Sequence, residues 1–129
     1  MMVDTQIVFW MAQVPGLLSE KAREAIDDAR LRGDAICISD KTLWELAMMI
    51  QRGIVLVKTT PRDFLLEVEK YFRVLPITGA IAERSVQFSP RFPRDPADRI
   101  IAATALVHGL PLITADEKII ASGEVPCIW

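Results

Sequence analysis

The feature that most constrains the fold is the alternation of short apolar runs, rich in β-branched residues, with longer segments of helical period. This alternation is typical of an α/β domain with a mostly parallel sheet, because each parallel strand needs a crossover helix to reach the next. The apolar runs predict strands at residues 1–3, 35–39, 74–77, 111–114 and 125–129. We therefore expect a central, mostly parallel sheet of about five strands flanked by helices, in a single domain over residues 1–129.

Start and stop signals predict where the helices lie. Ser19 is a favoured N-cap, and the helix after it should end at Gly33, in the position of a left-handed C-cap. Thr60 precedes a proline at a first helical position, which is a preferred place for proline. With similar signals elsewhere, the sequence predicts helices over residues 19–33, 40–52, 60–72, 78–88 and 95–109.

Composition excludes several classes of protein. Cys37 and Cys127 each lie in an apolar run, so we expect two buried reduced thiols and neither a disulfide framework nor a zinc site. The longest uncharged stretch, residues 100–115, is too short and too interrupted to span a membrane. No signal peptide is expected, because Asp4 precedes the first basic residue, Lys21. We expect a cytoplasmic protein.

Four carboxylates are placed where an α/β sheet binds its ligands, at the carboxyl ends of the strands. Asp4 follows the first predicted strand and Asp116 the fourth. Asp98 lies in the first turn of the helix that leads into the fourth strand, and Glu45 lies early in the helix after the second. We therefore expect all four side chains at the same edge of the sheet.

Each of these acids also has a purely structural interpretation. Asp4 and Asp116 can simply cap the helices that follow them, and Asp95 with Asp98 can form a capping pair. Glu45 is harder to explain in this way, since residues 43–50 around it are almost entirely apolar. We expect its carboxylate to be buried for a functional reason.

Four carboxylates in one cavity repel one another unless a cation lies among them or some stay protonated. Mg²⁺ or Mn²⁺ suits such oxygen ligands, and sites of this kind hydrolyse phosphodiesters by lowering the pKa of a bound water. Thr5 and Thr114 could hold a water or orient a carboxylate, although both are also ordinary β-formers at strand ends.

Other catalytic arrangements find little support. His108 is the only histidine, and its place at a helix end before Gly109 is explained by the helix dipole. The glycines are scattered, and none forms a phosphate-cradling loop. A phosphatase using Asp4 would need a second Asp two residues later, where the chain has Gln6.

Four segments together resemble a known family. They read VDT at residues 3–5, LWELA at 43–47, RDPADRIIAATA at 94–105 and LITADE at 112–117. In this order and spacing they resemble the PIN-domain ribonucleases, especially the VapC-type toxins of bacterial toxin-antitoxin pairs. The resemblance covers nearly the whole chain and implies a PIN-like three-layer α/β sandwich.

The resemblance also implies an activity and a set of site residues. It implies a Mg²⁺- or Mn²⁺-dependent endoribonuclease that cleaves single-stranded or structured RNA as the toxin of a toxin-antitoxin pair. The catalytic and metal-binding acids would be Asp4, Glu45, Asp98 and Asp116, supported by Thr5, Thr114 and Asp95. The alternative is a PIN-like module that has lost catalysis and serves in binding or assembly.

Partners follow from the same resemblance, which implies a homodimer and a small antitoxin protein. The first helical segments and the helix of residues 40–52 carry many adaptable apolar side chains: Phe9, Trp10, Met11, Leu17, Leu18, Met48 and Met49. We expect core packing to take more than half of them and an interface to take the rest.

The net charge of −2 at first argues against a polyanionic substrate. When the four candidate acids are subtracted from the 17 Asp and Glu, however, the 15 Lys and Arg outnumber the acids that remain. Arg91, Arg94 and Arg99 bracket the acidic motif, where they could meet RNA phosphates, although solvated surface explains each equally well.

Overall fold

The computed structural model describes all residues, 1–129, and contains one five-stranded sheet. The strand order is β3-β2-β1-β4-β5, and every pairing is parallel. The expected mostly parallel sheet of about five strands is therefore confirmed. The strands are short: β1 (Met2–Val3), β2 (Cys37–Ser39), β3 (Arg73–Leu75), β4 (Leu112–Ile113) and β5 (Cys127–Ile128).

The third strand is shifted toward the N-terminus from its predicted range of residues 74–77. It begins one residue earlier, because Arg73 pairs with Cys37, and it ends at Leu75. Pro76 has no N–H to donate to the ladder, so the strand cannot continue through it. The next N–H, of Ile77, donates to a carboxylate oxygen of Asp40 over 3.1 Å. The prediction erred because it extended the strand through the proline.

The helices match their predicted starts closely. Ser19 accepts a hydrogen bond from the N–H of Ala22, and Gly33 has φ of 72° as the left-handed C-cap. Thr60 accepts from the N–H of Asp63. The helices are α1 (Thr5–Gln13), α2 (Glu20–Arg32), α3 (Asp40–Gln51), α4 (Pro61–Tyr71), α5 (Gly79–Ser85), α6 (Pro96–Val107) and α7 (Glu117–Ser122), with a 3-10 turn at Pro15–Leu17.

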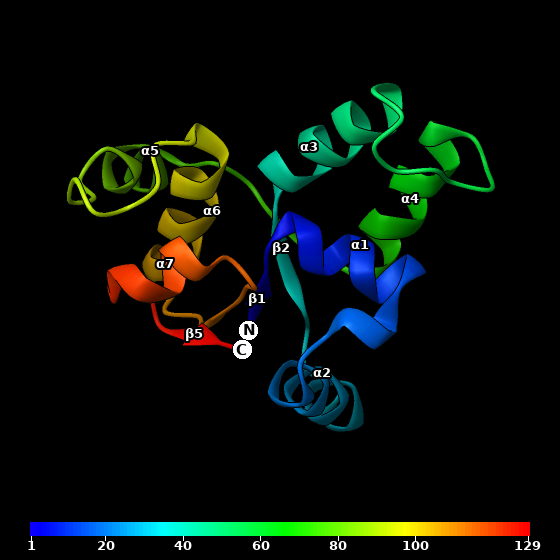
Figure 1. Cartoon of the computed structure of the whole chain (residues 1–129), viewed down its shortest axis with the longest axis horizontal. Helices are drawn as coiled ribbons and strands as arrows, with labels where there is room; N and C mark the ends of the chain where they lie inside the picture. Colours follow the sequence, from blue (N-terminus) through cyan, green and yellow to red (C-terminus); the bar gives the residue numbers. More distant parts are fainter.

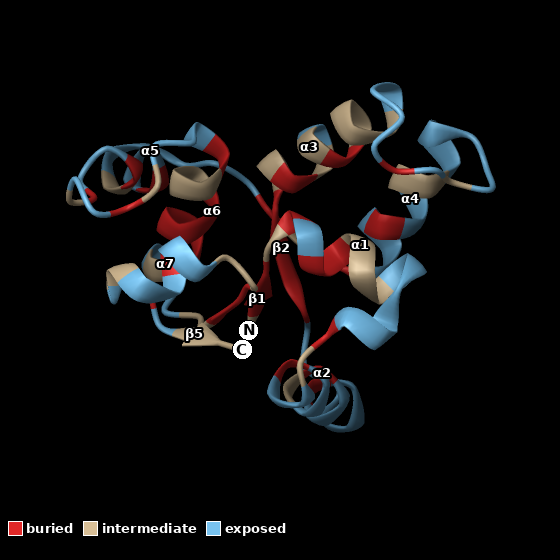
Figure 2. Cartoon of the chain, in the orientation of Figure 1, coloured by how far each residue is buried: buried red, intermediate tan, exposed pale blue.

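The helices form two layers around the sheet (Figure 1). On one side α5, α6 and α7 pack against the strands, and on the other side lie α1, α2, α3 and α4. Two separate apolar clusters, one for each face, make up the core, and the buried residues concentrate in β1 and β2 and on the helix faces turned toward them (Figure 2). The PIN-like three-layer sandwich is thus the observed architecture.

The two cysteines differ from each other. Cys37 is buried, whereas Cys127 in the edge strand β5 is only half-buried, and neither forms a disulfide. The expectation of two buried thiols was wrong for Cys127, because β5 lies at the edge of the sheet and is partly exposed. None of the helices combines the length and the apolar composition that a membrane crossing requires.

Candidate functional site

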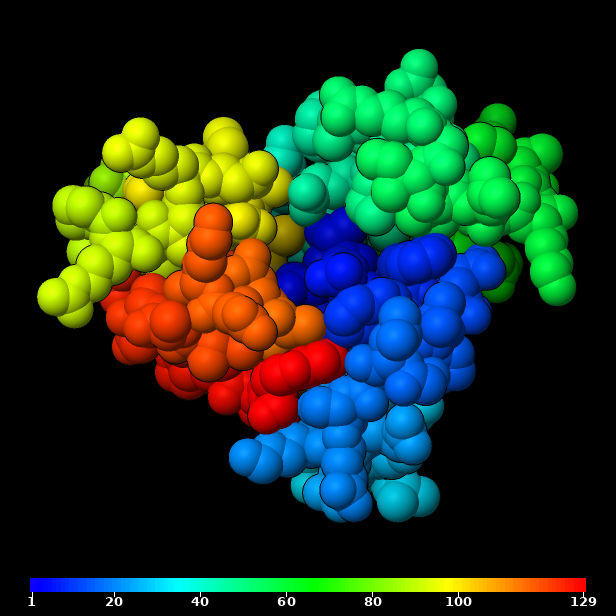
Figure 3. All heavy atoms as spheres, in the orientation of Figure 1, coloured from blue at the N-terminus to red at the C-terminus, as the bar shows by residue number.

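The acidic residues of the sequence motifs come together at the carboxyl edge of the sheet. Asp4 directly follows β1, and its N–H donates to the carbonyl of Ile113 at the end of β4 over 3.2 Å. The helix α3, with Glu45 in its second turn, starts directly after β2, and α6 packs beside it. Figure 3 shows the surface hollowed here, with the dark blue N-terminal residues between the residues coloured teal, yellow and orange.

Asp4 is the most constrained of the acids. One of its carboxylate oxygens accepts from the N–H of Ile7 over 3.0 Å and caps α1, and the other accepts from the hydroxyl of Thr114. Burial nevertheless raises the pKa of Asp4 to about 6, and repulsion from Asp116 and Glu45 adds to the effect. Asp4 therefore both caps α1 and belongs to the acidic site.

Thr114 connects two of the acids. Its buried hydroxyl donates to Asp4 and accepts from the N–H of Asp116 over 3.1 Å. Asp116 in turn caps α7 by accepting from the N–H groups of Lys118 and Ile119, over 2.8 and 3.1 Å. The hydroxyl thus fixes the orientation of one carboxylate and the backbone of another.

Glu45 is half-buried, so the expectation of a buried carboxylate holds only in part. The hydroxyl of Thr5 donates to its Oε1 over 2.6 Å and lies 3.2 Å from the hydroxyl of the buried Thr42. Burial raises the pKa of Glu45 and Asp95 repels its charge, whereas the hydrogen bond from Thr5 and the ammonium of Lys41 lower that pKa.

The start of α6 carries the remaining acids. Asp95 caps the helix through the N–H groups of Ala97 and Asp98, over 2.8 and 3.3 Å. Burial raises the pKa of Asp98 to about 7, followed by repulsion from four carboxylates: Asp95, Asp116, Glu45 and Asp4. All five acids therefore share one electrostatic environment in which negative charge is costly.

This donor set fits a hard divalent cation in charge and in atom type, since every candidate ligand is a carboxylate oxygen. No three of the side chains lie at the mutual distances of a formed metal centre. The acids surround the hollow at a distance from one another. One or two of them would bind Mg²⁺ directly, and waters would supply the remaining ligands, as is usual for this ion.

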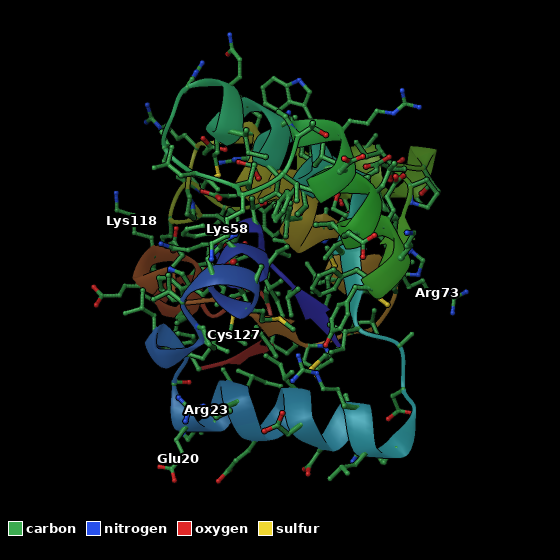
Figure 4. The ribbon with its side chains drawn as sticks, turned by 90° about the vertical axis from the view of Figure 1, so that its right-hand side faces the viewer. Glu20, Arg23, Lys58, Arg73, Lys118 and Cys127 are labelled. Atoms are coloured by element: carbon green, nitrogen blue, oxygen red, sulfur yellow. The ribbon has the colours of Figure 1, made fainter.

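The three arginines near the acidic motif are held differently. Arg91 and Arg94 are exposed, whereas Arg99 is partly buried and its Nε donates to the carbonyl of Pro93 over 2.8 Å. Arg99 therefore braces the loop before α6, and only the other two guanidinium groups extend freely into solvent. Elsewhere, Arg73 of β3 also extends away from the molecule (Figure 4), so positive charge is not confined to this edge.

The same loop has two further anchors. Glu124 accepts from the N–H and the hydroxyl of Ser89, over 3.0 and 2.8 Å, and these hydrogen bonds lower the pKa of its carboxyl. Phe88 and Phe92 are buried and stack with ring centroids 4.0 Å apart. The loop is therefore fixed to the α6 side of the site.

Sequence reasoning missed three residues around the acids. Thr42 and Lys41 precede Glu45 by three and four positions on one helix, a spacing that places side chains on the same face. That spacing could have identified both. Glu124 had no comparable signal, because it meets Ser89 across 35 positions of the chain.

The fold and the site define an α/β protein with a carboxylate cluster at the carboxyl edge of a parallel sheet. The chain belongs to the PIN domain family, whose model matches residues 1–123. This confirms the family resemblance of the four segments.

Relatives cover almost the full length of the chain. "Ribonuclease VapC22" of Mycobacterium tuberculosis is 30% identical over 118 residues, which is 92% of this chain and 88% of that protein. A toxin-antitoxin complex from Klebsiella pneumoniae has a TM-score of 0.69 at 25% identity and covers 99% of this chain and 95% of its own. FitAcB from Neisseria gonorrhoeae, with a TM-score of 0.70 at 22% identity over 98% and 94% of the chains, shares the fold.

Proposed function

We propose that this chain is a Mg²⁺- or Mn²⁺-dependent endoribonuclease and the toxin component of a toxin-antitoxin pair. The observation that carries the proposal is the convergence of five carboxylates at one edge of the sheet, where burial and, to a lesser degree, mutual repulsion raise the pKa of Asp4, Glu45 and Asp98. Membership of the PIN domain family and the similarity to a protein named as a ribonuclease support it. Residues 1–129 act as one domain, in the cytoplasm.

Some of the site residues would bind the cation, and others orient the carboxylates that bind it. Asp4, Glu45, Asp98 and Asp116 would hold the cation, which when bound supplies an activated water and stabilises charge on the leaving oxygen. Thr114 and Thr5 fix the orientation of Asp4 and Glu45. Asp95 adds negative charge beside Asp98.

The arginines complete the substrate site. Arg91 and Arg94 bind RNA phosphates, and Arg99, through its bond to Pro93, keeps their loop beside the acids. Phosphate contacts of this kind position the strand and do not read its sequence.

The decisive test is the variant Asp98→Asn beside the matched control Asp28→Asn, which removes an exposed carboxylate from α2. Asp98→Asn should lower metal-dependent cleavage of a single-stranded RNA by about 100-fold or more, because several kcal/mol of charge stabilisation depend on the cation. Asp28→Asn should cleave like the parent chain.

Retained cleavage in a folded Asp98→Asn protein would remove the proposal. It would also favour the alternative, a PIN module without catalysis that serves in binding. The presence of every acid of the motif speaks for the enzyme, since a decayed site should have lost at least one.

We also propose a homodimer and a small antitoxin as partners, since solved relatives of this fold include a toxin-antitoxin complex. Of the apolar side chains expected to divide between core and interface, only Leu18 is buried, while Leu17 is exposed and the other five are partly exposed. A groove of about 240 Å³ between α1, α2 and α4 adds to this surface, lined mainly by apolar residues that include Met11 and Phe64. Sedimentation of the purified chain as a monomer at micromolar concentration would contradict the dimer.

A further inference from the structure

Trp44 is more exposed than the other two tryptophans. Trp10 and Trp129 face each other with ring centroids 5.8 Å apart and are partly buried. Trp44, on α3, is 55% exposed. An exposed indole gains little from core packing, so its place beside Glu45 calls for a different explanation.

The ammonium group of Lys41 lies over the ring of Trp44. Nζ of Lys41 is 3.8 Å from the centroid of the Trp44 ring, well within the range of a cation–π contact. Lys41 also lies four positions before Glu45 on α3, a spacing that places the two side chains on the same face of the helix. Lys41 therefore lies within one turn of both Trp44 and Glu45, on the helix that borders the acidic hollow (Figure 3).

We propose that Trp44 and Lys41 form a subsite for an unpaired RNA base and its phosphate, next to the acids that would hold the cation. This inference rests on the proposed ribonuclease function and assigns two residues outside the acidic cluster to contacts with its substrate. Lys41 lies over one face of the ring, and the exposed part of the ring offers a base an aromatic surface beside a positive charge. This combination is the usual means of binding a single strand, because every base has a face to stack.

Charge favours RNA over a protein partner as the occupant. Lysine is depleted from the cores of protein interfaces, whereas it is common where a backbone phosphate is bound. Across the hollow, the loop before α6 carries the exposed Arg91 and Arg94. A single strand crossing the acids would therefore meet positive charge on both sides.

Base pairing should disfavour binding at this subsite. In a duplex each base is already stacked on its neighbours, so only an unpaired base can stack on Trp44 without an unstacking cost. The subsite therefore selects single strands, or the unpaired loops of structured RNA.

The test measures binding in the full chain carrying Asp98→Asn, so that cleavage does not consume the probe. The probes are a fluorescent single-stranded RNA of about 12 nucleotides and the same sequence as a duplex. Trp44→Ala should weaken single-strand binding by roughly 5- to 150-fold, the equivalent of ~1–3 kcal/mol per stacked base, and change duplex binding much less. Trp44→Phe should keep most of the affinity.

Leu31→Ala is the matched control, because Leu31 on α2 is an apolar side chain that is 87% exposed. In the chain without Asp98→Asn, Trp44→Ala should raise KM and leave kcat unchanged, since it removes uniform binding. Thermal melting of each variant should match that of the parent, as expected for an exposed side chain.

Equal single-strand affinity for Trp44→Ala and Leu31→Ala would overturn the inference. So would an equal loss on single strand and duplex, or a change in oligomeric state with unchanged RNA binding, which would make Trp44 a protein contact. If the ribonuclease proposal itself is wrong, the parent chain will not cleave RNA, whatever effect Trp44→Ala has on RNA binding.

Discussion

The two sides of the acidic hollow are built in opposite ways. On the α6 side, the loop before the helix is fixed by the stacked Phe88 and Phe92, by Glu124 and by Arg99. On the α3 side, Lys41 lies over the largely exposed ring of Trp44, and Glu45 is held by the single hydroxyl of Thr5. One side carries its arginines on a braced loop, and the other is held by fewer contacts.

This difference suits a substrate with a regular backbone and variable bases. Phosphates recur at constant spacing along a strand and can be met by groups such as Arg91 and Arg94 on a braced loop. Bases differ in size, and a flat exposed ring accepts all of them. The contrast predicts different consequences of mutation on the two sides.

The largest effect is expected from Phe92→Ala on the α6 side. Phe92 is 1% exposed and stacked, so its removal should lower the free energy of unfolding by about 3–5 kcal/mol. On the α3 side, Trp44→Ala should change it by no more than about 0.5 kcal/mol. Urea unfolding of both variants measures the contrast, and similar losses on the two sides would refute it.

A smaller effect is expected from Thr5→Val on the α3 side. The variant keeps the shape of the side chain but removes the hydrogen bond to Glu45, so the affinity for Mn²⁺ should fall by about 10- to 100-fold. Thr42→Val is the matched control, because Thr42 contacts Thr5 and makes no hydrogen bond to the carboxylate. Calorimetric titration measures both, and equal affinities in the two variants would show that Glu45 needs no such support.

The last prediction concerns pH and involves both sides. Because the pKa of Asp4 is raised to about 6 and that of Asp98 to about 7, the folded chain binds more protons than the unfolded chain between about pH 4 and 7. In a chelator, the stability from these groups is therefore present at low pH and should be lost as pH rises through this window. Thermal melts between pH 5 and 8 measure the decline.

Two controls sharpen the pH experiment. Asp98→Asn removes one of the two groups and should flatten the decline, and added Mn²⁺ should raise the melting temperature more at pH 8 than at pH 5. A chelated parent chain whose stability rises from pH 5 to 8 would contradict the raised pKa values.

Local signals in the sequence were enough to predict the layers and most of the helix starts. Ser19, Thr60 and Asp95 cap the helices expected of them, and the alternation of apolar runs gave the parallel sheet. Capping and periodicity act within a few residues, so one chain displays them. The grouping of the acids at one edge followed from the general geometry of parallel sheets.

Contacts between distant segments could not be predicted in the same way. The bond between Thr114 and Asp4 spans 110 positions, and that between Glu124 and Ser89 spans 35. The half-burial of Glu45 depends on how α6 packs against α3, which no local pattern encodes. These tertiary contacts decide which carboxyl groups have a raised pKa and which arginine side chains are exposed to solvent.

The capping acids have a consequence for how this edge is mutated. Asp4, Asp95 and Asp116 each begin a helix by accepting backbone N–H groups, so replacing any of them with alanine costs about 0.5–2 kcal/mol before any chemistry is considered. Asparagine caps as well as aspartate but carries no charge. An alanine scan would confuse frayed helices with lost activity, whereas an asparagine scan keeps the caps and removes the charge. Only at Asp4, where both oxygens accept, does asparagine also remove an acceptor, the one that Thr114 uses.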